Sequence, residues 1–388
     1  MTSQRRIAAV YMRGGTSKGV FFHARDLPAS GRERDACLLR VIGSPDPYAR
    51  HTDGMGGATS STSKVVILSP SRRDDCDVDF LFGAVSIDAP LIDYSGNCGN
   101  LSAAVGPFAV SEGLVPVTEG ITRVRIWQVN IGKRIDAFVP VRDGQVIEDG
   151  RFMEDGVPFP GAEVRLEFLD PGGEDDSVPG LPLLPTGALQ DRLQVPGVGN
   201  LAATLITAGN PTVFVRADAL GLTGREMPDE VNRDRKLLEK LEAIRAHAAV
   251  RMKLADSAAE ATSLRPATPK LSWVAKPAGY RTSAGVEVTA DRIDLLARIM
   301  SMGKLHHAYT GTGSIALAVA AALPGTLVNE IARTLPGVST RIGHVSGTLA
   351  VGAEVSQTDS GWRVDKAVLS RSARRLMSGW VHVPQAGL

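Results

Sequence analysis

The first half of the chain alternates short apolar runs with glycine-rich turns, a pattern typical of β-strands. Strands are expected at residues 7–11, 20–23, 64–68, 77–82 and 123–129. In the last of these, basic and apolar residues alternate, which predicts a strand with one exposed face.

The second half contains the clearest helical pattern. Between residues 234 and 252, apolar side chains recur at helical spacing and charges fill the other face, which predicts an amphipathic helix with a solvated charged surface. Strands are expected at residues 203–207 and 212–216, on either side of a turn at Gly209-Asn210-Pro211.

Residues 170–186 are rich in proline, glycine and acidic residues, which neither a helix nor a central strand tolerates. This segment predicts a connection between two domains, at residues 1–185 and 186–369. A chain of 388 residues is long enough for two cores. The tail at about residues 370–388 is expected to pack back on the first domain.

A long-range repeat supports this division. Residues 9–22 and 205–215 both read as strand, glycine-rich turn, strand. Each half later has a loop of small residues that leads into an alanine-rich helix, with loops at 96–100 and 310–314. Two similar halves that face each other would place both loops, and therefore a site, at one central cleft.

Composition excludes several classes of protein. The 43 basic and 42 acidic residues nearly cancel, so no nucleic acid or anionic membrane is an expected partner. The longest apolar run, around residues 315–323, is too short to span a bilayer, and no export signal is expected at the N-terminus. Three cysteines without metal-ligand spacing indicate free thiols and a cytoplasmic protein.

Both loops precede a helix, where free N–H groups and the helix dipole attract carboxylate or phosphate. Two such loops predict an anionic ligand with charge at both ends, although ordinary helix capping is the alternative. Cys98 lies inside the first loop, where a helix N-terminus stabilises a thiolate and makes it a usable base. The candidate binding residues of the loops are Asn97, Gly99, Asn100, Gly311, Thr312, Gly313 and Ser314.

Lys64 ends a long loop of small residues, just before an apolar strand. A lysine at the buried end of a loop loses solvation, which favours its neutral, basic form. The alternative is an exposed lysine at the start of a strand. Ser61 in the same loop, Asn210 in the second-half turn and His306 are further candidates for binding the ligand, although a packed or capping histidine is the commoner case.

Residues 12–19 resemble a phosphate-binding loop only superficially, because G-x-x-x-x-G-K-[ST] is absent and a strand follows where that motif requires a helix. A nucleotide kinase is therefore disfavoured. Arg13 is a candidate clamp for a carboxylate and Ser17 a candidate neutral hydrogen-bond donor. No HExxH or carboxylate–histidine cluster points to a metal, and the absence of G-x-S-x-G argues against a serine hydrolase.

These segments together resemble the 2-methylaconitate cis-trans isomerase (PrpF) family over nearly the whole chain. The most specific matches are residues 11–19 and 53–61, and residues 93–104 and 371–377 add to them. The resemblance implies a diaminopimelate epimerase-like α/β (α+β mixed) fold, with two pseudo-twofold-related domains, each a curled mixed β-sheet around a central helix, and the active site between them. It also implies Lys64 and Cys98 as the pair that moves a proton. We expect this amine and this thiol to be held on either side of an acidic carbon of the substrate.

The chain departs from the epimerase pattern at Thr310, where a second thiol is expected. Threonine cannot replace a thiolate as a base, so racemisation by two facing cysteines is disfavoured. The resemblance implies conversion of 2-methyl-trans-aconitate to 2-methyl-cis-aconitate without a cofactor, in propionate use by the 2-methylcitrate route beside an aconitase-like dehydratase.

Alternatives within the family are a 4-oxalomesaconate tautomerase and an aconitate or methylitaconate Δ-isomerase. An alternative of another class is a non-catalytic accessory protein of the dehydratase. A small tri- or dicarboxylate is the expected ligand, and a homodimer is a family-level expectation.

Overall fold

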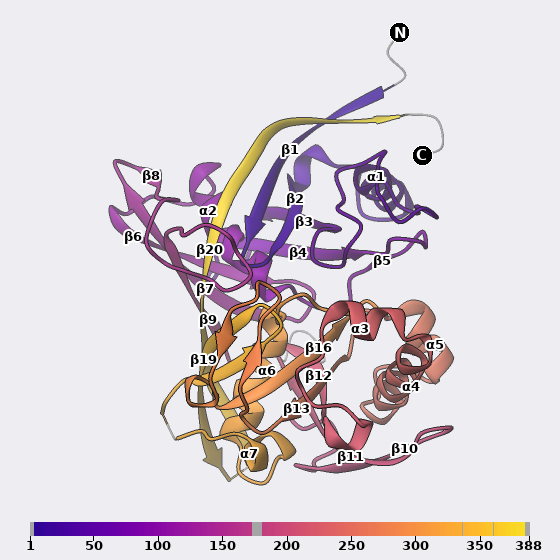
Figure 1. Ribbon diagram of the computed structural model, residues 1–388. Coiled ribbons are helices and arrows are strands. Elements are labelled where there is room, and N and C mark those ends of the chain that lie inside the picture. The colour runs from indigo at the N-terminus through magenta and orange to yellow at the C-terminus, as the bar shows by residue number, and fades with distance from the viewer. Residues whose placement is uncertain (1–3, 173–180, 336, 360, 385–388) are drawn as a thin grey trace.

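The computed structural model describes residues 4–172, 181–335, 337–359 and 361–384, which fall into two halves joined along one long strand (Figure 1). The strands of the first half are β1 Gln4–Gly14, β2 Ser17–His23, β3 Lys64–Pro70, β4 Val78–Val85, β5 Ile92–Asp93, β6 Gly120–Gln128, β7 Lys133–Arg142, β8 Gln145–Val146 and β9 Glu163–Leu169. Its helices are α1 Arg32–Ile42 and α2 Gly99–Ser111.

The second half carries more helices. They are α3 Pro228–Arg233, α4 Arg235–Arg251, α5 Ala258–Leu264, α6 Gly311–Ala322 and α7 Leu327–Ile331. Its strands are β10 Asp191–Val195, β11 Gly199–Ala208, β12 Asn210–Arg216, β13 Lys270–Ala275, β14 Tyr280–Arg281, β15 Glu287–Val288, β16 Leu295–Ser301, β17 Lys304–Leu305, β18 Thr340–His344, β19 Gly347–Thr358 and β20 Gly361–Pro384. Short 3₁₀ turns lie at Ala24–Asp26, Asp218–Leu220 and Ala290–Arg292.

The two halves repeat one strand-pairing pattern. In the first half, β1-β2-β3-β4-β6-β7 pair in the order antiparallel, parallel, antiparallel, parallel, antiparallel. In the second, β11-β12-β13-β16-β18-β19 pair in the same order with the same directions. The repeat inferred from the sequence is therefore confirmed, and each of these six strands of one half has a counterpart in the other.

Each half wraps its sheet around one fully buried helix. Gly99 to Val110 of α2 and Gly311 to Ala321 of α6 are buried on every side. Both helices are built from alanine, glycine and branched apolar residues, and such a helix without a polar face is stable only inside a core. Their N-terminal ends meet at the centre of the molecule, where Gly99 lies against Gly311 and Thr312, whereas Ser111 at the C-terminal end of α2 is exposed.

The strand β20 ties the two halves together. Its first part pairs with β19, residues 366–372 pair with β9, and residues 373–384 pair antiparallel with β1 (Figure 1). Residues 366–384 thus lie along the first half. Because one strand belongs to the sheets of both halves, their relative position is fixed by backbone hydrogen bonds as well as by packing.

Helices α1, α3 and α4 pack on the outer faces of the sheets, whereas α7 packs against α6. α4 corresponds to the amphipathic helix expected at residues 234–252, and the Asp234 side chain caps it by accepting a hydrogen bond from Leu237 N at 3.0 Å. Its apolar face, including Leu241 and Ile244, packs on the sheet of the second half with Trp273. Of the connection expected at residues 170–186, residues 173–180 lie outside the described part.

None of the helices in the described ranges combines the length and the apolar content needed to cross a membrane.

Candidate active site

The N-terminal ends of α2 and α6 meet at the centre of the molecule. Cys98 is the N-cap of α2 and its sulfur accepts from Leu101 N at 3.5 Å, while the Thr310 hydroxyl caps α6 by accepting from Gly313 N at 3.2 Å. The N–H groups in the first turn of an α-helix have no intrahelical acceptor. Two sets of such donors, with the positive ends of two helix dipoles, therefore lie at one place.

Lys64 and Cys98 are in direct contact. Lys64 is the first residue of β3, and its amine lies 3.2 Å from the Cys98 sulfur and 2.8 Å from the Ser17 hydroxyl oxygen. Only 8% of Lys64 and 7% of Cys98 is exposed. An amine and a thiol at this distance can exchange a proton without bulk water, which is the property a general acid–base pair needs.

This contact differs from the expected arrangement, in which the amine and the thiol lie on either side of an acidic carbon of the substrate. Both residues instead come from the first half, and they lie against each other. They form one unit on one side of the cleft.

A small cavity opens beside this pair, between the N-terminal ends of the two buried helices. Among the described residues that line it, none is acidic, so a carboxylate meets no like charge there. Seven of the predicted binding residues line it together with Lys64 and Cys98: Asn97, Gly99, Asn100, Asn210, His306, Gly311 and Thr312.

Two of these residues carry buried polar atoms without a partner among the described residues. These atoms are the side-chain nitrogen and oxygen of Asn97 and Nε2 of His306. Burial, followed by the charge of His307, lowers the pKa of His306 well below its usual range, so the ring is neutral. Because Nδ1 of His306 accepts from Ala308 N at 3.1 Å, the ring proton sits on Nε2, where it can be donated to a ligand.

Asn210 has a different task. Its side-chain oxygen accepts from Asn97 N at 2.7 Å, and its amide nitrogen donates to Asn97 O and to the Thr312 hydroxyl, both at 2.9 Å. These bonds use both amide protons. Asn210 lines the cavity but serves mainly to join the thiol loop of the first half to the start of α6.

The structure does not bring the other predicted residues to the wall of this cavity. Arg13 donates through Nη1 to Gly15 O at 3.1 Å and to the Ser372 carbonyl and hydroxyl oxygens at 3.0 and 3.1 Å, so it fastens β1 to β20. A guanidinium held in that way is a brace rather than a ligand clamp. Ser17 reaches the site through the Lys64 amine at 2.8 Å and through the Asn100 side-chain amide, which donates to its hydroxyl at 3.5 Å.

The remaining predicted residues act inside loops or helices. Ser61 contacts the Thr59 hydroxyl at 3.0 Å, and its carbonyl oxygen accepts from Lys18 N. Gly313 N bonds the Thr310 cap, and the Ser314 hydroxyl donates to Gly311 O at 2.7 Å. These contacts shape the two loops, and the neighbouring Ser60 lines the cavity instead.

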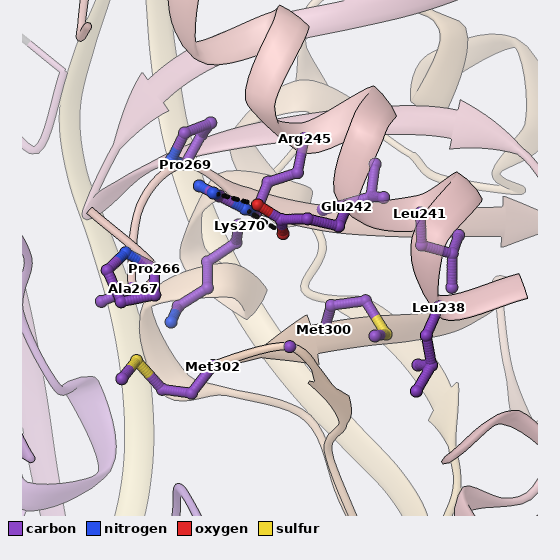
Figure 2. A pocket seen from close by; sticks show the side chains of 12 residues that line it. Leu238, Leu241, Glu242, Arg245, Pro266, Ala267, Pro269, Lys270, Met300 and Met302 are labelled. Atoms are coloured by element: carbon purple, nitrogen blue, oxygen red, sulfur yellow. Dashed lines mark hydrogen bonds and ion pairs between the residues drawn. The ribbon is translucent and has the colours of Figure 1, made fainter. Parts of the chain in front are cut away.

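Lys270 is a site residue that the sequence analysis missed. It is the first residue of β13, only 8% exposed, and lines the cavity with Lys64 and Cys98. Figure 2 shows its amine reaching between Ala267 and Met302, away from the Arg245–Glu242 ion pair behind it. A signal was present, since Lys270 precedes an apolar strand in the second repeat as Lys64 does in the first.

No group of three or more His, Cys, Asp or Glu side chains in the described residues is arranged to hold a metal ion. Among the described residues, the groups that can bind a ligand or move a proton at this site are amines, a thiol, an imidazole and backbone N–H donors.

Comparison with known proteins agrees with this geometry. The family described as PrpF protein matches residues 4–384. A 2-methyl-aconitate isomerase of Shewanella oneidensis is 56% identical over 390 residues, and one of Cupriavidus necator is 55% identical over 389 residues, each covering 98% of both chains. A 3-methylitaconate isomerase of Eubacterium barkeri is 42% identical and matches the full length of both chains.

Solved structures confirm the predicted fold. A crystal structure of methylitaconate-delta-isomerase superimposes with a TM-score of 0.77 at 41% identity, covering 99% of this chain and 97% of that one. A hydroxyproline epimerase from Agrobacterium vitis, at 15% identity, gives a TM-score of 0.56 over 98% of this chain and 94% of its own. At this identity the similarity shows a shared fold only. The diaminopimelate epimerase-like architecture is therefore present, and the chain belongs to the PrpF family.

Proposed function

We propose that this protein converts 2-methyl-trans-aconitate to 2-methyl-cis-aconitate by removing and returning a proton, with no organic cofactor. The observation that carries the proposal is the buried contact of 3.2 Å between Lys64 and Cys98 beside a cavity without acidic residues. The names of the two relatives at 55–56% identity support the choice of substrate.

The chemistry begins at the methylene carbon that lies between a carboxylate and the double bond of the substrate. The Lys64–Cys98 unit takes a proton from this carbon, and the electron pair spreads into an extended dienolate. The former double bond then has single-bond character, so the molecule can rotate about it. Return of a proton to the methylene carbon completes the cis-trans isomerisation.

The main obstacle is the extra negative charge on a substrate that is already anionic. The first N–H groups of α2 and α6, the free Nε2–H of His306 and the unpartnered amide of Asn97 provide donors that are fixed before the reaction. Preorganised donors of this kind stabilise a developing oxyanion, because they need no reorganisation when the charge appears.

Return of the proton to a different carbon would move the double bond instead. The relatives named 3-methylitaconate isomerase and 4-oxalomesaconate tautomerase, at 42% and 38% identity, therefore define the competing substrates. We also propose a cytoplasmic location, which the free cysteines favour. The family resemblance implies a homodimer and a place next to a 2-methylcitrate dehydratase, and we propose these too.

The decisive experiment is proton NMR of the purified protein with each candidate acid in deuterated water. We expect 2-methyl-trans-aconitate to give the cis isomer with deuterium at the methylene carbon, at a rate well above that for 3-methylitaconate and oxalomesaconate. Faster turnover of another acid would move the protein to that branch of the family. An absence of exchange with every acid would identify a non-catalytic accessory protein.

A further inference from the structure

Lys270 occupies the position in the second half that Lys64 occupies in the first. Each is the first residue of the strand that pairs in parallel with the second strand of a hairpin, β3 with β2 and β13 with β12. Each of these strands then pairs antiparallel with the next one, β4 or β16. The repeat therefore directs two lysines from opposite halves into one cavity, which both of them line.

The surroundings of the two amines differ. The Lys64 amine contacts Ser17 and Cys98, whereas the structure gives the Lys270 amine no hydrogen bond and no ion pair among the described residues. The counterpart of Cys98 in the second half is Thr310, whose hydroxyl caps α6. A buried amine without a partner at the wall of a cavity is available to a ligand.

Rotation of the intermediate gives a reason for a second proton donor away from the Lys64–Cys98 unit. Rotation by half a turn about the former double bond exchanges the positions of the two substituents on the rotating carbon, a carboxylate and the deprotonated methylene. When this carbon rotates and the methyl-bearing carbon stays in place, the carbon that lost its proton beside Lys64 and Cys98 is carried across the cavity. A proton donor in the other half then lies nearer to it.

Two side chains of the second half that line this cavity can carry a proton, Lys270 and His306. Burial keeps His306 neutral, so it donates a hydrogen bond but has no second proton to give. On the basis of the isomerase function proposed above, we propose that Lys270 is the catalytic acid of the second half, which protonates the dienolate after rotation.

The charges around Lys270 suit this role. Burial first, and then the charge of Lys64, lower the pKa of Lys270 to about 8, with Arg245 acting in the same direction and Asp93 and Cys98 against it. An acid whose pKa lies near the working pH holds its proton in the resting enzyme and still releases it readily. Lys270 therefore differs from an ordinary exposed lysine in the property that proton donation needs.

The proposed cycle balances. The C–H bond breaks at the Lys64–Cys98 unit, which gains one proton, and a new C–H bond forms with a proton from the Lys270 ammonium, which becomes a neutral amine. No electron is gained or lost. Exchange of one proton with solvent at each group, or one turnover in the reverse direction, restores the starting state.

The test follows two reactions in deuterated water by proton NMR, isomerisation and exchange of the methylene proton in the starting isomer. With Lys270→Met, we expect isomerisation to fall about 10²–10⁴-fold, the usual contribution of a general acid. Exchange in the starting isomer should continue, because the Lys64–Cys98 unit can still take and return a proton. Continued exchange also shows that the variant is folded.

Two further variants complete the design. Lys270→Arg retains a positive charge but cannot give up a proton near neutral pH, so it should not restore isomerisation. Lys304→Met removes an exposed lysine of the same half and should behave like the wild type. The proposal is overturned if Lys270→Met isomerises normally, if exchange and isomerisation fall together, or if Lys270→Arg is active. Failure of the wild-type protein to act on any of the acids would instead refute the proposed function.

Discussion

Gly99 and Gly311 touch each other backbone to backbone where α2 and α6 begin. A Cβ atom added to Gly99 would lie 2.7 Å from Thr312 N, and one added to Gly311 would lie 2.7 Å from the carbonyl carbon of Gly99. Side chains do not approach backbone atoms that closely. The two helix starts can share one cavity only because neither residue has a side chain.

Replacing Gly99 or Gly311 with alanine should therefore push the two helices apart. We expect the free energy of unfolding to fall by about 1–3 kcal/mol, the usual effect of overpacking, and turnover to fall at least about tenfold as the N–H donors lose alignment. Urea unfolding and steady-state kinetics measure the two effects. Gly379→Ala is the control, since a Cβ there meets no atom within 4 Å. Unchanged turnover in both variants would contradict this account.

Lys64→Met and Cys98→Ser should each abolish isomerisation while leaving the fold intact. Each change removes one member of a buried amine–thiol contact, and neither Met nor Ser can act as a base at neutral pH. Turnover is measured by NMR and the fold by circular dichroism.

Cys76→Ser is the matched control for the thiol, because Cys76 lies at a turn and does not line the cavity. It should retain activity. Wild-type turnover by both Lys64→Met and Cys98→Ser would remove the pair from the mechanism.

Some of this arrangement could be predicted from the sequence. Alternation and small-residue loops indicate the hairpins and the two buried helices, because these signals are local. The meeting of Lys64 with Cys98 depends on β-sheet pairing and on the start of α2, and only the family resemblance suggested it. Lys270 lies in a segment without a glycine-rich motif. Its one sequence signal, a lysine before an apolar strand, could be related to Lys64 only once β13 was aligned with β3.

The largest difference between the sequence-based prediction and the structure concerns Arg13, and it arises from a partner that is distant in the sequence. Arg13 lies beside a glycine turn and resembles an anion clamp, but its acceptor Ser372 is 359 positions away in β20. No local pattern specifies that β20 returns to pair with β1. The role of a polar side chain next to a loop therefore depends on which distant strand lies beside it.

Arg13→Ala is accordingly expected to affect stability more than substrate binding. Loss of a charged donor that holds Gly15 O and Ser372 should lower the free energy of unfolding by about 1.5–3 kcal/mol. The KM should change less than about threefold, since Arg13 does not line the cavity.

Urea unfolding and substrate titration separate these effects. Arg374→Ala, an exposed arginine opposite Arg13 in the β1–β20 ladder, is the control. A tenfold rise in KM with normal stability would show that Arg13 contributes to substrate binding.

The stability of the protein should decrease as the pH falls below about 6.5, because of buried histidines. Burial first, and then the charges of Arg298 and Arg371, lower the pKa of His344 to about 3. Between pH 6.5 and about 3 the folded state therefore keeps His344 neutral, whereas the unfolded state takes up a proton there. The state that binds more protons gains as pH falls, so each such histidine costs up to about 1.4 kcal/mol of stability per pH unit.

His344→Asn should reduce the slope of the unfolding free energy against pH by about 1.4 kcal/mol per pH unit, the equivalent of one proton. The slope is measured by urea unfolding between pH 6 and 5, above the pH range in which most carboxylates titrate. The variant should lose some stability at pH 8, where the hydrogen bond from Ser346 N to Nδ1 is missing or altered, but the slope is the informative quantity. His382→Asn, at an exposed position of β20, controls for the loss of a histidine. Equal slopes in His344→Asn and the wild type would show that His344 is protonated in the folded state, which its burial beside two arginines makes unfavourable.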